Sequence, residues 1–103
     1  MPTYYDKTGQ PIDVDRWCEL FEDSAYKRVA YTEIDAADCY VSTVWLGLNH
    51  NWFAGPPEIF ETMVFGGAYG GACIRYATET DAQSGHARTV AAVTAGRSPE
   101  ETE

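Results

Sequence analysis

The chain has 103 residues, 45% of them hydrophobic and 22% charged, which predicts one globular domain around a single hydrophobic core. Its net charge is −9, from 16 acidic and 7 basic side chains, and this balance disfavours direct binding to nucleic acids or to anionic membrane surfaces. The apolar runs are too short to span a bilayer, and the N-terminus lacks the basic-then-apolar order of a signal peptide, so we expect a cytosolic protein.

The first predicted elements are a short hairpin and a helix. Tyr4 and Tyr5 suit a strand, and a turn ending at Gly9 would fold residues 3–12 back on themselves. Asp13 can then cap a helix over residues 13–22 by accepting a free backbone N–H. Four apolar side chains recur at i, i+3, i+4 and i+7 in this segment and predict its buried face: Val14, Trp17, Cys18 and Phe21.

Three or four strands follow. Residues 27–34 and 39–48 are rich in β-branched and aromatic side chains, and the short gap between them predicts an antiparallel hairpin. Residues 58–65 carry apolar side chains on both faces, which predicts a strand that is central or covered on both sides. Residues 73–77 are a fourth candidate strand. Residues 44–67 should form a long β-hairpin in which four side chains are buried: Val44, Leu46, Phe60 and Val64.

The last predicted element is a helix that begins after Thr78 and ends at Gly96. Thr78 is a good N-cap, and the small side chains on one face of the helix should let it pack closely against the sheet. The sequence therefore predicts a single α+β domain over residues 1–96, with an N-terminal hairpin, a helix, a three- to four-stranded antiparallel sheet and a C-terminal helix packed on that sheet. Residues 97–103 are expected to form a disordered acidic tail.

The two histidines are the main candidates for chemistry. His50 lies in a predicted loop, where it could act as a general base or a metal ligand with Glu58 or Glu61 from the facing strand. The Asn-His-Asn and Gly-Pro-Pro sequences around it are more typical of turns. His86 lies on the packed face of the last helix, which favours a buried, hydrogen-bonded side chain. Because the spacing matches no zinc motif, we predict no catalytic residue, no metal site and no cofactor.

The three cysteines also argue against a metal or disulfide framework. Cys18, Cys39 and Cys73 are odd in number and widely spaced, and no CxxC pair occurs. We predict that they are small, buried apolar side chains in a reducing compartment.

The strongest functional signal is the aromatic loop over residues 49–57. Trp52 and Phe53 lie beside a Gly-Pro-Pro turn and have little reason to be buried. Exposed aromatic rings around a polar tip are typical of a binding surface, and the prolines would reduce the entropy that the loop loses on binding. We predict that six residues contact a partner or a symmetry mate: Asn49, His50, Asn51, Trp52, Phe53 and Glu58.

Two segments carry a resemblance that extends over residues 4–93. The segment STVWLGLNHNWFAGPPEIFETMVFGG, followed by RYATETDAQSGHARTV, is similar to a family of small uncharacterised proteins carried by tailed bacteriophages and prophages, notably those of actinobacteria. The opening YYDKTGQPIDVDRWCELFED fits the same pattern, and the match is strongest over residues 43–65. Family members usually carry fewer aromatics after the position of His50. The resemblance implies a phage origin and the host cytoplasm, and it implies no activity.

Three hypotheses about function stay open. The first is a non-enzymatic accessory protein that binds a host protein, a phage protein or a small ligand through the aromatic loop, and that could form a homodimer. The second is a small enzyme or metal-dependent factor built on His50 with Glu58 or Glu61. The third is an acidic mimic of nucleic acid that inhibits a host protein. None of the three involves direct binding of nucleic acid or of a membrane.

Overall fold

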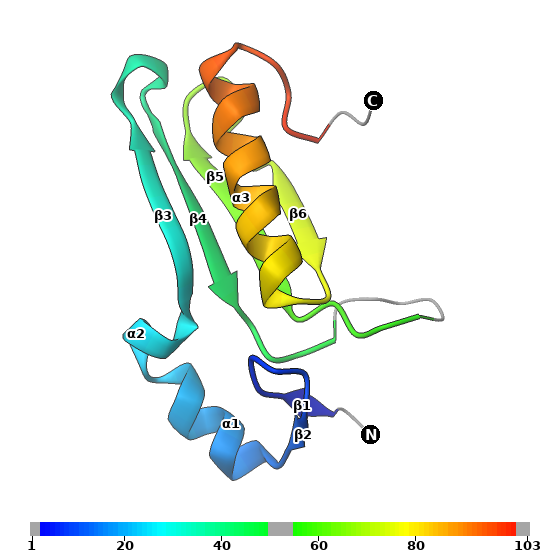
Figure 1. The fold of residues 1–103 in the computed structure, drawn as a ribbon. Coiled ribbons are helices and arrows are strands. Elements are labelled where there is room, and N and C mark those ends of the chain that lie inside the picture. Colours follow the sequence, from blue (N-terminus) through cyan, green and yellow to red (C-terminus); the bar gives the residue numbers. More distant parts are fainter. Residues whose placement is uncertain (1–2, 50–54, 101–103) are drawn as a thin grey trace.

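The computed structural model describes residues 3–49 and 55–100, and these form the predicted α+β fold. A four-stranded antiparallel sheet in the order β3-β4-β5-β6 carries the long helix α3 across one face (Figure 1). A small hairpin and two short helices pack at one end of this sheet (Figure 1). Within the described ranges, no helix has the length and apolar character needed to cross a membrane. The elements are β1 (Tyr4–Tyr5), β2 (Pro11–Ile12), α1 (Val14–Phe21), α2 (Ser24–Lys27), β3 (Arg28–Ile34), the 3₁₀ turn η1 (Asp35–Ala37), β4 (Cys39–Trp45), β5 (Phe60–Gly66), β6 (Cys73–Tyr76) and α3 (Glu79–Thr94).

The two central strands, β4 and β5, bury alternate side chains beneath α3. Successive side chains of a strand point to opposite faces, so only every second residue can face the helix. Opposite residues in the antiparallel register share a face, and the three buried pairs are Val41 with Val64, Thr43 with Thr62, and Trp45 with Phe60. These three layers form the middle of the core. Phe60 and Val64 are therefore buried as predicted.

The sequence-based expectation for β4 is wrong about which face is buried. Val44 and Leu46 are only partly buried, whereas Thr43 and Trp45 are completely buried. Both faces of β4 carry apolar side chains, so alternation alone does not distinguish them. A buried threonine needs a hydrogen-bond partner, and Thr43 finds one in the Thr62 hydroxyl at 2.6 Å. That partner lies on another strand and is not visible from the local pattern.

The helix α3 approaches the sheet closely because its inner face is small. The Thr78 side chain caps the helix, as predicted, by accepting the Asp81 backbone N–H at 3.1 Å. Gly85 lies over Tyr76 of β6, and a Cβ atom added to Gly85 would overlap the Tyr76 ring and its oxygen. The buried Tyr76 hydroxyl has no hydrogen-bond partner within the described part of the chain. The absence of a side chain at Gly85 thus sets the spacing between α3 and β6.

Two tryptophans join the N-terminal hairpin and α1 to the end of the sheet. Trp17 of α1 donates its indole N–H to the Leu46 carbonyl at 2.9 Å, and Trp45 of β4 donates its indole N–H to the Tyr5 carbonyl at 3.0 Å. Trp17 also stacks on Phe21, with ring centroids 4.7 Å apart. Each indole therefore has a polar partner where its ring packs into the core.

The buried face of α1 differs from the predicted one. Leu20 is the buried residue of this helix, whereas Val14 is 47% exposed and Cys18 is exposed. The helix contacts the core through Leu20 and the partly buried rings of Trp17 and Phe21. The prediction failed because the buried face of α1 is centred on Trp17, Leu20 and Phe21, at i, i+3 and i+4. Val14 and Cys18 lie one step around the helix from this face and are exposed.

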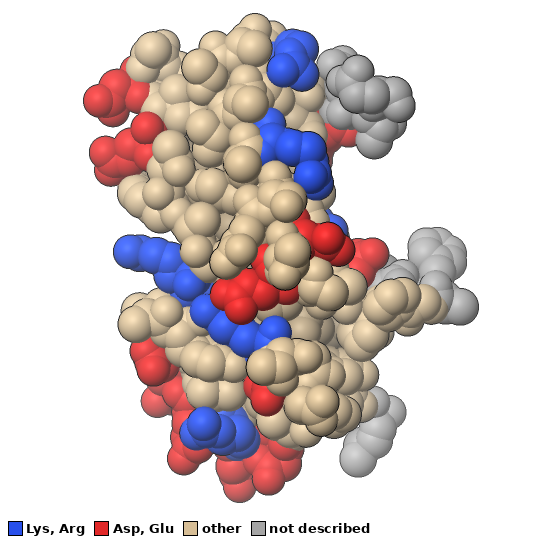
Figure 2. All heavy atoms as spheres, in the orientation of Figure 1, with Lys and Arg blue, Asp and Glu red and all other residues tan. Residues whose placement is uncertain are grey.

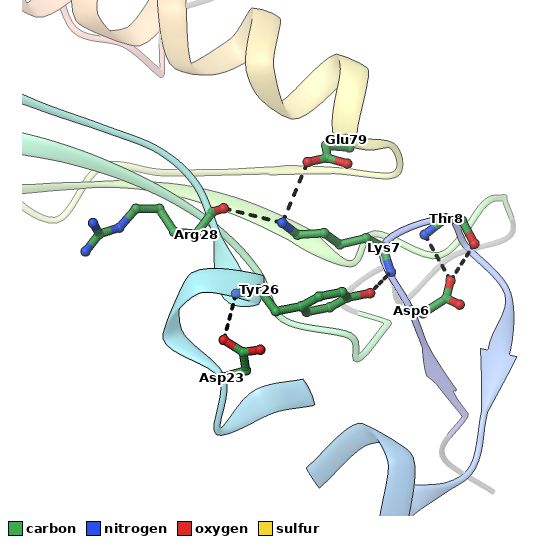
Figure 3. Close-up of polar contacts among 7 residues, drawn as sticks. All are labelled: Asp6, Lys7, Thr8, Asp23, Tyr26, Arg28 and Glu79. Atoms are coloured by element: carbon green, nitrogen blue, oxygen red, sulfur yellow. Dashed lines mark hydrogen bonds and ion pairs between the residues drawn. The ribbon is translucent and has the colours of Figure 1, made fainter. Parts of the chain in front are cut away.

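Lys7 connects the turn of the N-terminal hairpin to three other elements (Figure 3). Its backbone N–H donates to the Tyr26 hydroxyl of α2 at 2.8 Å. Its ammonium group lies 3.3 Å from the Arg28 carbonyl of β3 and 3.7 Å from the Glu79 carboxylate of α3. The N-terminal hairpin is therefore tied to the main sheet and to the start of the long helix.

The turn that presents Lys7 is held by the Asp6 carboxylate (Figure 3). This carboxylate accepts the Thr8 backbone N–H at 2.9 Å and the Thr8 hydroxyl at 2.6 Å. Burial raises the pKa of Asp6, but the hydrogen bonds from Thr8 and from the Gln10 and Gly9 backbone together lower it below its usual value. The turn is therefore most stable with Asp6 ionised.

Candidate binding surfaces

The predicted binding loop is described only at its two ends. His50, Asn51, Trp52 and Phe53 lie outside the described residues, so their predicted contact role stays a prediction. The structure brings Asn49 and Glu58 together, because the Glu58 backbone N–H donates to the Asn49 side-chain oxygen at 3.0 Å. This bond closes the base of the connection between β4 and β5. Two of the six predicted contact residues therefore already share a structural role.

His86 lies in a buried polar cluster in which its described hydrogen-bond partners are two threonines. Its Nδ1 atom lies 2.7 Å from the Thr43 hydroxyl, and its Nε2 atom lies 2.9 Å from the Thr32 hydroxyl. Burial lowers the pKa of His86, which favours the neutral imidazole. A neutral ring with one donor and one acceptor matches two hydroxyl partners. The side chain therefore links α3 to β3 and β4, as expected for a packed histidine.

The described residues also bring together no metal-binding set. Within residues 3–49 and 55–100, no three side chains among histidine, cysteine, aspartate and glutamate are grouped so that they could hold an ion. Both ring nitrogens of His86 are bonded to threonine, so it has no carboxylate to orient it as a general base. The hypothesis of a His/Glu enzyme was built on His50, which lies outside the described residues, so it stays a prediction.

A ladder of aromatic rings lies on the sheet face opposite α3. Tyr31 of β3, Tyr40 of β4 and Phe65 of β5 occupy neighbouring strands and are 42%, 38% and 41% exposed. The Tyr31 and Tyr40 centroids are 5.4 Å apart, and the Tyr40 and Phe65 rings stack with centroids 4.9 Å apart. We call these three residues the aromatic ladder. The ladder was not predicted from the sequence, although Tyr40 and Phe65 lie one position away from the buried Val41 and Val64 of their strands.

Acidic side chains surround one end of the aromatic ladder. Glu33, Asp35 and Asp38 line a surface hollow together with Tyr40 and Phe65. Acidic side chains (red) lie along the edge of the molecule at the β3–β4 turn in Figure 2. Carboxylates attract cationic groups through their charge. The faces of the neighbouring aromatic rings attract cations through their electron density. This end of the sheet is therefore suited to lysine or arginine side chains.

A second surface is rich in arginine, although Glu58 and Glu100 also line it, and it lies along the outer edge of β6. A groove of about 850 Å³ separates this strand from α3 and from residues 97–100. Three arginines line it, Arg75, Arg88 and Arg97, out of 7 basic residues in the whole chain. Arg75 pairs with Glu61 at 3.3 Å, whereas Arg88 and Arg97 form no salt bridge with any described residue. In Figure 2, some of the basic side chains (blue) lie in the upper part of the view near α3 and the C-terminal segment, and others lie farther down the same face.

The C-terminal segment 97–100 lies against this groove. The Glu100 carboxylate accepts the Cys73 backbone N–H of β6 at 3.0 Å, and Ser98 and Pro99 are partly buried. We expected residues 97–103 to form a disordered tail. In the structure, residues 98–100 are held beside β6 by the Glu100–Cys73 hydrogen bond and by the partial burial of Ser98 and Pro99. Residues 101–103 lie outside the described residues. The sequence offers no signal for the Glu100 contact, which joins positions 27 apart.

Comparisons with known proteins add no family to these observations. Searches against models of protein families, against curated proteins and against solved structures found no match to this chain. The phage-family resemblance of residues 4–93 therefore stays a prediction.

Proposed function

We propose that this chain is a non-enzymatic binding protein that docks a basic segment of a partner protein on the open face of its sheet. The observation that carries this proposal is the aromatic ladder of Tyr31, Tyr40 and Phe65, exposed on the face that α3 does not cover. Rigid aromatic rings supply contact area at low cost in side-chain entropy and are enriched among the residues that dominate interface energies.

The charge around the ladder favours a basic partner. The carboxylates of Glu33, Asp35 and Asp38 border the rings of Tyr40 and Phe65. The chain itself already places a cation on the ladder, because the Arg28 guanidinium lies 5.4 Å from the Tyr31 ring centroid. A lysine or arginine of a partner could use the remaining rings in the same way, with the acids adding attraction.

The biological setting of this proposal comes from the sequence. The resemblance over residues 4–93 supports an accessory protein of a bacteriophage that acts in the host cytoplasm, with a host or phage protein as partner. The loop over residues 49–57 is a separate predicted contact. Its described part, Asn49 and residues 55–57, adjoins the end of β4 and the start of β5, whereas Tyr40 and Phe65 lie at the other ends of these two strands. The enzyme hypothesis and the nucleic-acid-mimic hypothesis stay open, and no contact among the described residues supports either of them.

The test measures binding of a fluorescently labelled peptide of alternating arginine and glycine by anisotropy. We expect the wild-type chain to bind it and the double variant Tyr40→Ser/Phe65→Ser to bind at least about tenfold more weakly, because the contact rings are lost. Val14→Ser is the matched control, since it removes an apolar side chain of similar exposure from α1. Binding should also weaken as salt is raised.

Two results would contradict the proposal. Equal affinity of the wild type and the double variant would show that the peptide binds elsewhere. The second result is a wild-type chain that does not bind the peptide but self-associates, together with a double variant that stays monomeric. The aromatic ladder would then be a homodimer interface and not a site for a basic partner. Analytical ultracentrifugation of both proteins at several concentrations distinguishes this second result.

A further inference from the structure

The groove beside β6 gathers arginine side chains in a strongly acidic protein, and two glutamates, Glu58 and Glu100, also line it. The chain carries 16 acidic and 7 basic side chains, yet three of the seven basic groups line this one groove. Arg88 and Arg97 are exposed and make no salt bridge within the described ranges, despite the excess of carboxylates. Two unpaired guanidinium groups on one groove can each bind a carboxylate in bidentate fashion.

The groove also exposes backbone donors of an edge strand. β6 pairs with β5 on one side, and no other described strand pairs with its outer side. The Cys73 backbone N–H points outward, because it donates to the Glu100 carboxylate. Backbone groups of an antiparallel strand alternate in direction, so the Arg75 N–H lies on the same outer edge. An extended peptide can form hydrogen bonds with such an edge.

The C-terminal segment shows which chemistry the groove accepts. Residues 97–100 lie beside β6 with Ser98 and Pro99 partly buried, and Glu100 places its carboxylate on the Cys73 N–H at 3.0 Å. The carboxylate of Glu100 therefore already accepts a hydrogen bond from one backbone N–H of the groove. The arginines that surround this contact are not satisfied by it, since Arg88 and Arg97 make no salt bridge with Glu100 or with any other described acid.

We propose that the β6–α3 groove binds an acidic segment of a partner protein in extended conformation, and that residues 98–100 compete for it within the same molecule. The partner's carboxylates pair with Arg88 and Arg97, and one of them replaces Glu100 at the Cys73 N–H. This site is independent of the aromatic ladder, which lies on β3, β4 and β5. A tethered segment acts at high effective concentration, so the wild-type chain binds free acidic peptides weakly until this segment is displaced.

The experiment uses the full-length chain and a labelled peptide with the sequence of residues 98–103, SPEETE, as the acidic probe. Fluorescence anisotropy gives the Kd for the wild type and for Glu100→Gln. We expect Glu100→Gln to bind the peptide at least about fivefold more tightly, because the competing carboxylate is gone. A peptide with glutamine in place of its three glutamates should bind at least about tenfold more weakly than SPEETE.

A charge-matched pair of variants locates the site. In the Glu100→Gln background, Arg88→Gln/Arg97→Gln should weaken peptide binding at least about tenfold. Arg16→Gln/Arg28→Gln removes the same charge from exposed positions on α1 and β3 and should change the Kd less than about twofold. A thermal melt of each variant checks that the fold is kept.

Each other outcome overturns a stated part of the inference. Equal losses from the two arginine pairs would mean that net charge, and not the groove, attracts the peptide. Equal binding of the glutamate and glutamine peptides would exclude carboxylate recognition. A Kd that does not change between the wild type and Glu100→Gln would exclude competition by the C-terminal segment. If Glu100→Gln binds no SPEETE at all, the groove is not an acidic-peptide site.

Discussion

The three cysteines have different surroundings, although the sequence suggested one common role for them. All three are free thiols, but Cys18 is exposed, and Cys39 and Cys73 are partly buried. The prediction that all three are buried is therefore wrong, most clearly for Cys18, which lies on the outer side of α1. Cys73 donates its Sγ–H to the Glu61 carboxylate at 3.1 Å. Burial and this carboxylate raise the pKa of Cys73 to about 11.

These differences predict the order in which the thiols react. At pH 8 the native chain should be alkylated by iodoacetamide first at Cys18, and at Cys73 about tenfold or more slowly, because the thiolate is the reactive form. Glu61→Gln should speed the reaction of Cys73, since it removes the charge that opposes ionisation. Peptide mass spectrometry over a time course measures the three rates. Cys73 reacting as fast as Cys18 would contradict the placement of its thiol.

Packing between α3 and β6 depends on one missing side chain. Glycine inside an exposed helix is normally a weakness, and replacing it with alanine adds roughly 1 kcal/mol of helix stability. At Gly85 the added Cβ would overlap the Tyr76 ring, which is buried beneath the helix. Overpacking of this kind typically costs about 1–3 kcal/mol, so the steric cost outweighs the gain in helix propensity.

We therefore expect Gly85→Ala to lower the free energy of unfolding, and Gly85→Leu to lower it further. Urea denaturation measures both. The control is Ala87→Gly at an exposed position of the same helix, which should cost only about 1 kcal/mol through propensity. A Gly85→Ala variant that is more stable than the wild type would show that α3 does not lie as close to β6 as described.

The stability of the molecule should depend on pH through His86. This side chain joins α3 to β3 and β4, and burial holds its pKa below the ordinary value of 6.5. The unfolded chain then binds a proton at pH values where the folded chain does not. The stabilising contribution is complete above pH 6.5 and is lost as the pH falls below that value, because protonation favours the unfolded state.

The comparison of the wild type with His86→Gln isolates this effect from that of the carboxylates. Glutamine keeps a donor and an acceptor for the two threonine hydroxyls but cannot be protonated in this range. Urea denaturation at pH 7.5, 6 and 5 should show that the wild type loses stability more steeply than the variant. Parallel pH profiles of the two proteins would mean that His86 has the same pKa in the folded and unfolded chains.

Much of the fold follows from local patterns. The Thr78 cap and the small inner face of α3 depend on residues within a few positions of each other, as do the runs of β-branched residues in β3 and β4. Short-range hydrogen bonds and side-chain periodicity suffice to specify such elements. The order of a hairpin, a helix, an antiparallel sheet and a second helix then limits the chain to an α+β domain.

The choice of faces and surfaces depends on contacts between distant positions. Thr43 is buried in place of Val44 because Thr62 and His86, 19 and 43 residues away, satisfy its hydroxyl. The aromatic ladder arises from the register of β3, β4 and β5, and the basic groove from the approach of residues 97–100 to β6. When a strand carries apolar side chains on both faces, hydrophobicity alone does not decide which face is buried against the core. The hydrogen-bond partners of its polar side chains then decide it. Those partners are assembled only when the helix and the neighbouring strands come together.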